Sequence, residues 1–592
     1  MGTRFEVLSP MKALVVSVRA PIGDKIAGGQ TLVILEAMKM EHIVAADRGG
    51  IVREVRVGAD AIVEPGDVLV VLESADVQPA SEETELSDPD AMRADLAEVY
   101  ERHAFGLDEQ RPEAVAKRRK TGQRTARENL TDLVDEGTFV EYGALVIAAQ
   151  RQRRSHEDLV ARTPADGMVA GVGRINGDLF EDAPTRAVVT SYDYTVLAGT
   201  QGTMNHLKKD RMFEIAEQQQ LPVVLFAEGG GGRPGDTDYA LVAGLDCRAF
   251  QYFAELSGKV PLVGVGSGRC FAGNAALLGC CDVVIATEAS NIGMGGPAMI
   301  EGGGLGVFAP EDIGPSDTQY RNGVIDVLVE DEAEAVAVAK KYLGYFQGVL
   351  SNWQAPDQRP LRAAIPENRL RVYDVRTIID TIADVGSVLE LRGGFGEGMV
   401  TSLARIEGRP LGIIANHPAH LGGAIDGEGA DKASDFMALC STFGIPIVFL
   451  CDTPGFMVGP DAEASGLVKR AARLFTTGAS LAVPFSTIVL RKGYGLGAQS
   501  MAGGSFKAPI FTISWPTGEF GGMGLEGAVK LGFRKELASI EDPVARDAMF
   551  QQMVGLAYER GKAINMAEHF EIDAVIDPVD TRRWILSAIA PR

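Results

Sequence analysis

Leu221–Asp236 reads LPVVLFAEGGGGRPGD, and Ile445–Asp461 reads IPIVFLCDTPGFMVGPD. In each stretch an apolar run, typical of a buried parallel strand, ends at an acidic residue that opens into a turn. Glu228 in the first stretch stands 224 residues before Asp452 in the second. A repeat with so long a period indicates two homologous domains rather than a solenoid.

A second pair of stretches extends the repeat. Val260–Ala276 (VPLVGVGSGRCFAGNAA) is similar to Val483–Gln499 (VPFSTIVLRKGYGLGAQ), and we place Gly273 opposite Gly497 at the same offset of 224. From about residue 140 onward, β-type apolar runs alternate with helical stretches. This alternation predicts α/β layers in both copies.

The N-terminal part differs in character. Residues 5–73 alternate short Val/Ile/Leu-rich runs with Gly, Asp and Pro turns, which predicts a small all-β module, and its two halves read as copies of one unit. Residues 74–90 are polar and acidic, which predicts a flexible linker. The expected domains are therefore 1–73 for the β module, 74–90 for the linker, and 91–345 and 365–592 for the two α/β copies.

The segment EAMKME places Lys39 between Met38 and Met40, at the point where the two β half-units meet. The symmetry of such a module puts this point at the tip of a hairpin, where a side chain is most exposed. The alternative is an ordinary exposed lysine in a turn. The methionines on both sides of the lysine favour a functional reading.

Two strand-to-helix turns are the next candidates. Ala272 and Gly273 lie in one, and Leu496 and Gly497 lie in the other. Backbone N–H groups at a helix N-terminus can point at an anion, and aimed at a developing enolate they form an oxyanion hole. A single glycine at such a turn is more often needed for packing. Two turns in related positions of two homologous domains are what a two-substrate interface needs.

Residues 5–73 resemble the biotinyl domain family, in which the lysine between the two methionines carries biotin. Related lipoyl domains usually have an acidic residue before the lysine, where this chain has Met38. The resemblance implies covalent biotin on Lys39, with Met38 and Met40 as its flanking residues, and a biotin protein ligase that attaches it.

Most of residues 91–592 resemble the carboxyltransferase family of biotin-dependent acyl-CoA carboxylases, including TARENLTDLVDEGTFVEYG, TIVLRKGYGLGAQSM and ISWPTGEFGGMGLEGAV. The family implies two crotonase-like (ClpP/crotonase superfamily) domains, active sites between subunits and a homo-hexamer. It also implies that Ala272 and Gly273 hold the thioester enolate while Leu496 and Gly497 hold the ureido oxygen of biotin. The expected activity is transfer of CO2 from carboxybiotin to the α-carbon of an acyl-CoA.

Some positions depart from the family. It commonly has an aromatic residue and then a residue that tunes acyl-chain choice where this chain has Ala498 and Gln499. The absence of this aromatic residue predicts a wider acyl pocket that accepts a longer acyl chain, as in the long-chain acyl-CoA carboxylases of fatty acid metabolism. The basic run that includes Lys117, Arg118 and Arg119 could bind coenzyme A phosphates, although such runs are more often solvated faces.

Bulk properties exclude several functions. The net charge of −23 predicts repulsion from nucleic acid and from anionic membrane surfaces. The six cysteines form no CxxC pair, so we read most of them as reduced core thiols. His417 and His420 form an HxxH without an evident third ligand, so no metal is expected. No signal peptide and no apolar run of about 20 residues is present, which predicts a cytoplasmic protein.

No P-loop motif and no region resembling an ATP-grasp fold is found in the chain. A separate ATP-dependent biotin carboxylase subunit is therefore expected. Two alternatives stay open: a biotin-dependent decarboxylase, since the transfer step is reversible, and a catalytically silent biotinylated scaffold.

Overall fold

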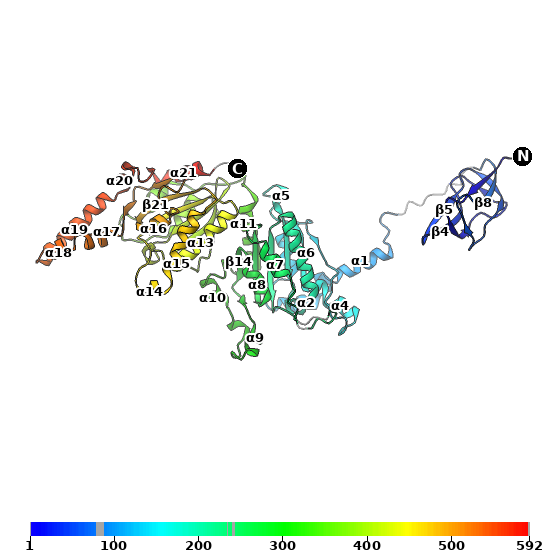
Figure 1. The fold of residues 1–592 in the computed structure, drawn as a ribbon, viewed down its shortest axis with the longest axis horizontal. Helices are drawn as coiled ribbons and strands as arrows, with labels where there is room; N and C mark the ends of the chain where they lie inside the picture. Colours follow the sequence, from blue (N-terminus) through cyan, green and yellow to red (C-terminus); the bar gives the residue numbers. More distant parts are fainter. Residues whose placement is uncertain (1, 78–87, 234, 240–242, 590–592) are drawn as a thin grey trace. The chain divides into compact units, whose positions relative to one another are not determined.

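The computed structural model of the protein describes residues 2–77, 88–233, 235–239 and 243–589. The chain folds into two compact units, Met1–Glu98 and Val99–Arg592, and Figure 1 labels several of their helices and strands. Residues 78–87 of the predicted linker lie outside the described residues.

The first unit is a sandwich of two four-stranded antiparallel sheets, with strand orders β1-β8-β6-β3 and β5-β4-β2-β7. Alternate side chains point inward, as a pleated strand requires, and Val15, Leu35 and Leu72 are fully buried between the sheets. The strands are β1 Arg4–Leu8, β2 Ala13–Val18, β3 Lys25–Ile26, β4 Thr31–Ala37, β5 Met40–Ala45, β6 Gly50–Val55, β7 Ile62–Val63 and β8 Val68–Ser74.

The second unit contains two similar eight-stranded sheets, which we call the first and the second repeat. The first repeat has the order β16-β14-β13-β12-β11-β10-β9, and β15 also pairs with β13. The second has the matching order β24-β22-β21-β20-β19-β18-β17, and β23 also pairs with β21. In each repeat the first three strands pair antiparallel and the later ones parallel.

The strands of the first repeat are β9 Val140–Glu141, β10 Met168–Arg174, β11 Arg186–Tyr192, β12 Val223–Gly229, β13 Leu262–Phe271, β14 Val283–Thr287, β15 Asn291–Gly293 and β16 Val327–Val329. Those of the second are β17 Leu389–Leu391, β18 Met399–Ile406, β19 Arg409–Asn416, β20 Ile447–Thr453, β21 Phe485–Tyr494, β22 Thr512–Ser514, β23 Glu519–Gly521 and β24 Ala574–Val575. The central strands are nearly continuous apolar runs because helices cover both faces of the sheets.

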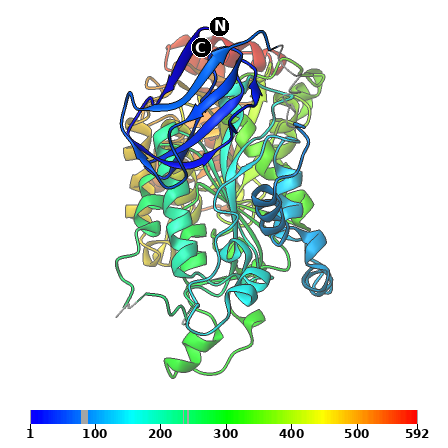
Figure 2. The same ribbon diagram turned by 90° about the vertical axis from the view of Figure 1, so that its right-hand side faces the viewer.

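Helices lie on both sides of the strands in Figure 2. In and before the first repeat they are α1 Ala94–Ala104, α2 Pro112–Arg119, α3 Ala126–Leu133, α4 His156–Arg162, α5 Asp182–Thr185, α6 Thr203–Gln219, α7 Ala249–Glu255, α8 Gly273–Gly279, α9 Pro297–Gly302, α10 Ser316–Arg321 and α11 Glu332–Gln347. In the second they are α12 Val375–Ile382, α13 Gly427–Thr442, α14 Pro460–Ala464, α15 Leu467–Ala479, α16 Gly495–Ser500, α17 Leu525–Gly532, α18 Arg534–Ala538, α19 Pro543–Arg560, α20 Ala563–Glu568 and α21 Thr581–Ala588.

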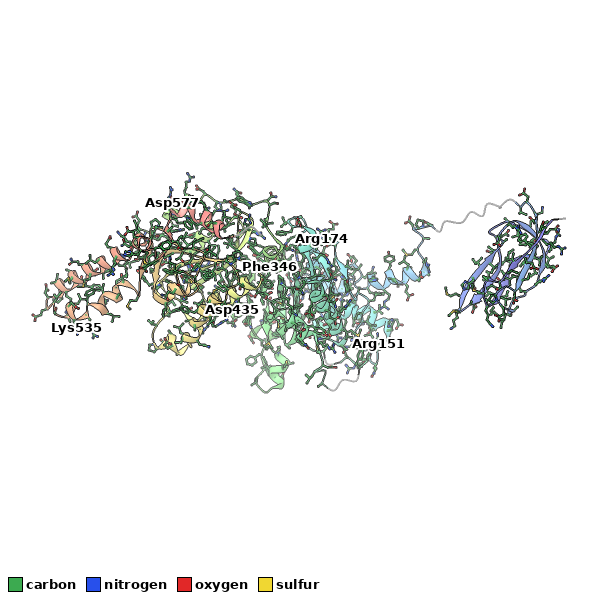
Figure 3. The ribbon with its side chains drawn as sticks, turned by 45° about the horizontal axis from the view of Figure 1, so that its top comes forward. Arg151, Arg174, Phe346, Asp435, Lys535 and Asp577 are labelled. Atoms are coloured by element: carbon green, nitrogen blue, oxygen red, sulfur yellow. The ribbon has the colours of Figure 1, made fainter. Side chains whose placement is uncertain are left out.

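The two repeats share one hydrophobic core, which contains buried residues of both sheets. Phe346 of α11, labelled in Figure 3, packs edge-on against Phe443 at the end of α13, with ring centroids 5.1 Å apart. Because α11 belongs to the first repeat and α13 to the second, this contact fixes the repeats against each other. No helix in the described part of the chain is long and apolar enough to cross a bilayer.

Candidate active site

Lys39 lies at the tip of the hairpin that joins β4 and β5. Ala37 pairs with Met40, so Met38 and Lys39 alone form the turn, with φ of 55° and 67°. Two central residues with positive φ define a type I′ turn, which usually requires Asn-Gly. Met38 and Lys39 therefore hold a left-handed backbone that their Cβ atoms disfavour, and such strain is concentrated at functional sites.

The surroundings of Lys39 suit an attached group. Met38 is 96% exposed, and Lys39 and Met40 are exposed as well. Within the described residues, the Lys39 amine has no hydrogen bond or ion pair that would have to be broken. The two-residue turn presents this amine at the end of the hairpin, so the residues present fit covalent attachment of a prosthetic group.

The first predicted oxyanion pair lies where β13 passes into α8. Ala272 has φ 53° and ψ −124°, and its N–H donates to the Gly293 carbonyl at 3.0 Å. Gly273 is the first residue of α8, and its N–H has no acceptor among the described residues. Of the predicted pair, only Gly273 therefore presents a free donor.

The second predicted pair lies where β21 passes into α16. The N–H groups of Leu496 and Gly497 belong to the first turn of α16 and have no acceptor in the described part of the chain. The Leu496 side chain is 63% exposed. Gly497 cannot carry a side chain, because a Cβ there would lie 2.6 Å from the Gly455 Cα. This pair presents two free donors side by side, as an oxyanion hole requires.

The strand registers correct the predicted pairing of the two turns. Val223 of β12 pairs with Leu262 of β13, whereas Ile447 of β20 pairs with Phe485 of β21. Matching residues of β12 and β20 are therefore 224 positions apart in the sequence, whereas matching residues of β13 and β21 are 223 positions apart. The connection between the two strands is one residue shorter in the second repeat. The expected match of Gly273 with Gly497 was wrong.

The corrected register matches Ala272 with Gly495 and Gly273 with Leu496. Both Ala272 and Gly495 have positive φ, 53° and 57°, which agrees with this match. The residue of the first repeat that corresponds to Gly497 is Asn274, whose N–H also has no acceptor among the described residues. The free donors of the first turn are thus Gly273 and Asn274.

The Asn274 side chain, which sequence reasoning missed, holds the first turn in place. It is fully buried, and its Oδ1 accepts from the Gly231 N–H at 3.2 Å and from Gln201 Nε2 at 3.0 Å. Its Nδ2 donates to the carbonyls of Gly199 at 3.1 Å and Glu228 at 2.8 Å. One amide therefore ties two segments, the loop at 199–201 and the end of β12 with the residues after it, to the start of α8. The only sequence signal was an Asn directly after the predicted Gly.

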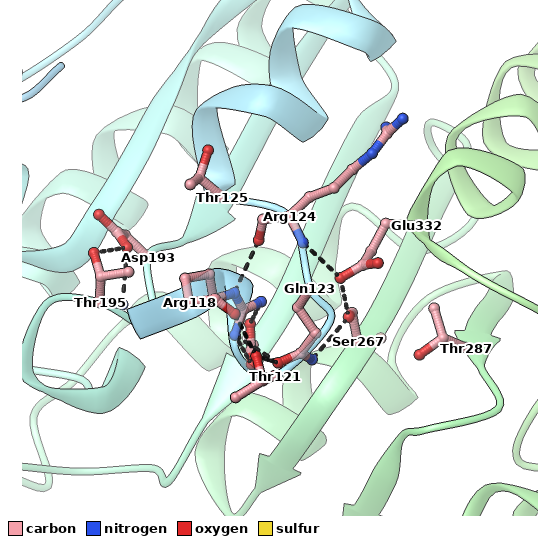
Figure 4. A network of polar contacts seen from close by, with 12 residues as sticks. Arg118, Thr121, Gln123, Arg124, Thr125, Asp193, Thr195, Ser267, Thr287 and Glu332 are labelled. Atoms are coloured by element: carbon pink, nitrogen blue, oxygen red, sulfur yellow. Dashed lines mark hydrogen bonds and ion pairs between the residues drawn. The ribbon is translucent and has the colours of Figure 1, made fainter. Parts of the chain in front are cut away.

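A buried ion pair lies beside this turn. Arg118 of α2 donates to both oxygens of Glu228, at 2.7 and 2.6 Å, and its guanidinium lies over the Tyr194 ring. Figure 4 shows Arg118 in the network that continues through Gln123 and Ser267. Burial raises the pKa of the Glu228 carboxyl to about 7, against the opposing effect of Arg118.

The pairing of Arg118 with Glu228 separates Arg118 from the other residues of the basic run that was predicted to bind coenzyme A. Arg118 is buried and bonded inside the protein, while Lys117, Arg119 and Lys120 are exposed. Arg119 forms an ion pair with Glu128 and lines an open depression of about 910 Å³ together with Arg124 and other charged residues. The surface part of the run is therefore Lys117, Arg119 and Lys120.

The two residues predicted to tune acyl choice lie in the wall of a cavity of about 720 Å³ next to the second turn. Ala498 is buried and Gln499 is exposed. Apolar side chains contribute much of the wall, and they are Phe506, Phe520, Leu525, Met566 and Phe570. Mostly apolar walls with a few polar groups are typical of small-molecule sites of this size.

His417 and His420 lie near carboxylates, with His417 Nδ1 3.8 Å from Asp374 and His420 Nε2 3.7 Å from Asp426. Among the described residues, no group of three or more His, Cys, Asp or Glu side chains is arranged to hold a metal ion. The six cysteines are unpaired, but only Cys270, Cys440 and Cys451 are buried. The expectation that most of them are core thiols holds for these three alone, and Cys280 is exposed.

A β sandwich with a lysine at its hairpin tip, followed by two crotonase-like repeats with free N–H groups at equivalent turns, defines the class of biotin-dependent carboxyltransferases. Residues 117–590 match the carboxyl transferase domain family, and residues 6–72 match the biotin-requiring enzyme family. The chain therefore belongs to the carboxyl transferase family. It is a fusion of a biotin carrier with a carboxyltransferase of the acyl-CoA carboxylase type, with covalent biotin as its cofactor.

Among curated relatives, it is similar to the methylmalonyl-CoA carboxyltransferase 12S subunit of Propionibacterium freudenreichii subsp. shermanii, with 33% identity over 80% of this chain and 90% of that protein. It is 32% identical to the biotin-dependent long chain acyl-coenzyme A carboxylase beta4 subunit of Mycobacterium tuberculosis, over 82% of this chain and 92% of that one.

Two solved structures are also similar. A single-chain, multi-domain long-chain acyl-CoA carboxylase matches with a TM-score of 0.82 and 57% identity over 99% of this chain. This chain spans only 56% of the length of that protein. The transcarboxylase 12S hexamer matches with a TM-score of 0.72 and 30% identity, over 84% of this chain and 95% of that chain. The predicted fold class, a small biotinyl sandwich before two crotonase-like α/β domains, is confirmed.

Proposed function

We propose that this chain carries biotin on Lys39 and transfers a carboxyl group from it to the α-carbon of an acyl-CoA. The observation that carries the proposal is the strained two-residue turn that presents the free Lys39 amine, in a chain that also holds two equivalent helix N-termini with unpaired N–H groups. Biotin, when attached, supplies the means of carrying the carboxyl group. The protein supplies orientation and preorganised donors.

Each of the two strand-to-helix turns is assigned to one oxygen atom that becomes negatively charged in the reaction. The Leu496 and Gly497 N–H groups stabilise negative charge on the ureido oxygen, and the first turn stabilises the enolate oxygen of the thioester. We assign this second role to the N–H groups of Gly273 and Asn274, because Ala272 already donates to Gly293. Ala272 would contribute only if that bond opened. Loss of one such donor typically costs about 3–4 kcal/mol of transition-state stabilisation.

The preferred substrate is a longer acyl-CoA. The small buried Ala498 borders the 720 Å³ cavity beside the second turn, which leaves room that an aromatic residue would fill. Lys117, Arg119 and Lys120 are the exposed cations of the basic run and are assigned to coenzyme A phosphates. The similarity to long-chain acyl-CoA carboxylases supports this choice.

The proposal includes partners and a setting. A biotin protein ligase modifies Lys39, a separate ATP-dependent biotin carboxylase loads the biotin, and the subunits form a homo-hexamer, as in the transcarboxylase 12S structure. The cytoplasm is the location predicted from the sequence. The decarboxylase and silent-scaffold alternatives have less support, since the similar proteins are carboxylases and a transcarboxylase.

The carrier role is tested by intact mass measurement of the chain expressed with a biotin ligase. We expect a gain of one biotin, lost in Lys39→Arg. The matched control is Lys25→Arg, which changes an exposed lysine of the same unit and should leave the gain intact. An unmodified wild-type chain in the presence of an active ligase would remove the main support for the proposal.

The acyl preference is tested with acetyl- and dodecanoyl-CoA in the presence of a biotin carboxylase. Dodecanoyl-CoA should give the higher kcat/KM, and Ala498→Phe should reduce turnover of dodecanoyl-CoA more than that of acetyl-CoA. A strict acetyl preference of the wild-type enzyme would refute the long-chain assignment.

A further inference from the structure

A separate cavity of about 310 Å³ lies at the junction of the two repeats. Its wall includes Phe180 of the first repeat, Arg405 of the second, and Trp353 of the connection between them. It shares no residue with the two strand-to-helix turns or with the cavity beside Ala498. The volume falls at the lower end of the range of about 300–1,000 Å³ typical of small-molecule pockets.

Arg405 is the central polar group of this cavity. It is only 3% exposed, and its guanidinium donates to the carbonyls of Gly344 at 2.6 Å, Gly348 at 2.9 Å and Gly408. The rings of Phe180 and Tyr345 lie 5.6 and 5.4 Å from the guanidinium carbon. Within the described residues Arg405 has no ion pair with a carboxylate. Burial lowers the pKa of Arg405 to about 10, which leaves it charged at neutral pH.

The other charged groups compensate this cation only in part, because burial lowers the pKa of Arg405 by more than nearby Asp384 raises it. The one acid in the cavity wall, Asp384, accepts from Arg582 at 2.7 Å and from the N–H groups of Glu407 and Gly408. Lys340 and Lys341 also line the cavity, and their amines donate to main-chain carbonyls rather than to carboxylates. A buried cation that makes no hydrogen bond to a carboxylate is incompletely compensated, so an anion bound here would be stabilised.

The rest of the wall is apolar and partly open. Trp353 is 45% exposed and Val385 is 59% exposed, although both are large apolar side chains. Leu179, Leu350 and Phe180 continue this surface. Exposed apolar side chains that gather around a cavity mark a surface that an apolar group can cover. The cavity thus combines one buried cation with an apolar wall.

We propose that this cavity binds a monocarboxylate with an apolar body, of the size of a medium-chain fatty acid anion. The carboxylate meets Arg405, and the chain lies along Phe180, Trp353 and Val385. Because both repeats and their connection contribute to the wall, the bound anion stabilises the packing of the repeats at their junction. The cavity is a binding site distinct from the two strand-to-helix turns.

The test uses decanoate as the probe and the fluorescence of the full-length protein as the readout. The chain has three tryptophans, and Trp353 is the one that lines this cavity. We expect a saturable change in emission with decanoate and at least about tenfold weaker binding of decanol, which lacks the charge. Trp353→Phe should remove the fluorescence change, while calorimetry still detects binding.

Two variants locate the site. Val385→Glu places a carboxylate at an exposed position of the cavity wall and should weaken decanoate binding about tenfold or more. The matched control is Val140→Glu, at a position of similar exposure (62%) on β9, which should bind normally. Arg405→Gln should also abolish binding. If Arg405→Gln does not fold, the comparison of Val385→Glu with Val140→Glu still decides the test.

Three results would overturn the proposal. They are the absence of saturable decanoate binding, equal affinity for decanol and decanoate, and equal loss of binding in the Val385→Glu and Val140→Glu variants. The first result would show that the cavity does not bind a fatty acid anion. The second would show that the carboxylate does not contribute to binding, and the third that decanoate binds at another place.

Discussion

The two repeats place a buried carboxylate at the same point of the sheet but neutralise it differently. Glu228, near the end of β12, is paired with Arg118 from α2. Asp452, near the end of β20, is paired with Arg491 of the adjacent strand β21. The position of the first repeat that corresponds to Arg491 is Gly268, where a Cβ would lie 2.7 Å from Glu228 Oε1. The duplicated fold has kept the charge pair and changed the residue that completes it.

The largest predicted effect comes from breaking these pairs. In Arg118→Met, the Glu228 carboxylate has no other hydrogen-bond donor among the described residues. In Arg491→Met, the Asp452 carboxylate still accepts from the Tyr373 hydroxyl at 2.8 Å and from the Lys492 N–H at 3.1 Å. We expect Arg118→Met to cost about 3–5 kcal/mol and to lower the Tm by roughly 10 °C. Arg491→Met should cost less. Thermal unfolding followed by circular dichroism measures both.

The pH dependence identifies the cause of that loss. Burial already raises the pKa of Glu228 above that of an unfolded glutamate, so the folded state holds the proton more tightly and stability falls as pH rises. Without Arg118 the pKa of Glu228 rises further, so the fall in stability should continue to higher pH, and the Tm of Arg118→Met should recover part of its loss at about pH 5. A control, Arg211→Met, breaks an exposed pair with Glu214 and should cost at most about 1 kcal/mol. A pH-independent loss in Arg118→Met would contradict the uncompensated charge.

The second predicted effect compares the two turns. Leu496→Pro removes one proposed donor at the first turn of α16, where proline is tolerated, and Leu496→Ala removes the exposed side chain but keeps the N–H. We expect kcat to fall about 100- to 1,000-fold in the proline variant and by less than about threefold in the alanine variant. Steady-state carboxylation of an acyl-CoA measures this.

Gly273→Pro is the corresponding change in the first turn, and it should cause a loss of similar size if both turns stabilise charge. Unchanged far-UV circular dichroism is required in each variant. Equal losses in Leu496→Pro and Leu496→Ala would show that the side chain matters and not the N–H.

The smallest predicted effect concerns a difference between the helices α6 and α13. Lys209 of α6 is fully buried with its amine 2.9 Å from the Tyr192 hydroxyl, and the matching position of α13 is Ala433. Burial lowers the pKa of Lys209 to about 7. Between about pH 7 and pH 10 the unfolded chain therefore binds a proton that the folded chain lacks, so stability should rise with pH.

Lys209→Met should reduce this rise, to which Lys208 and Lys432 also contribute because burial lowers their pKa to about 8. It should increase the Tm at about pH 6 by a few degrees, because the buried charge of Lys209 is gone. The measurement is the Tm as a function of pH for wild type and variant. A variant that is less stable than wild type at about pH 6 would mean that the bond to Tyr192 outweighs the burial of the amine.

Much of the fold could be predicted from the sequence because its signals are local. The Val/Ile/Leu-rich runs at residues 11–18, 30–35, 50–57 and 67–72 correspond to β2, β4, β6 and β8. Glu228 and Asp452 lie near the ends of β12 and β20, as expected from an apolar run followed by a turn. The EAMKME segment forms the predicted hairpin tip because symmetric flanking strands leave only two residues for the turn.

The rest of the site depends on contacts that no local pattern encodes. The second repeat has one residue fewer before β21, which shifts the match of the two turns by one position. Gly495 and Gly497 on both sides of Leu496 hide this shift, because either glycine can be matched with Gly273 in the sequence. Arg118 sits in a run of four cations, and only the fold reveals that this one points inward to Glu228. The bond from Ala272 to Gly293 also joins separate strands.

The turn at Met38 and Lys39 has an evolutionary consequence. Asn-Gly would fit the same backbone with less strain, so substitution of Met38 and Lys39 by that pair should improve folding. Selection that acted on folding alone would drift toward such a pair. The absence of that pair means that the sequence of this hairpin is set by the enzymes that must recognise it and by the group that it carries. The module tolerates a less stable turn because this turn is the one that is modified.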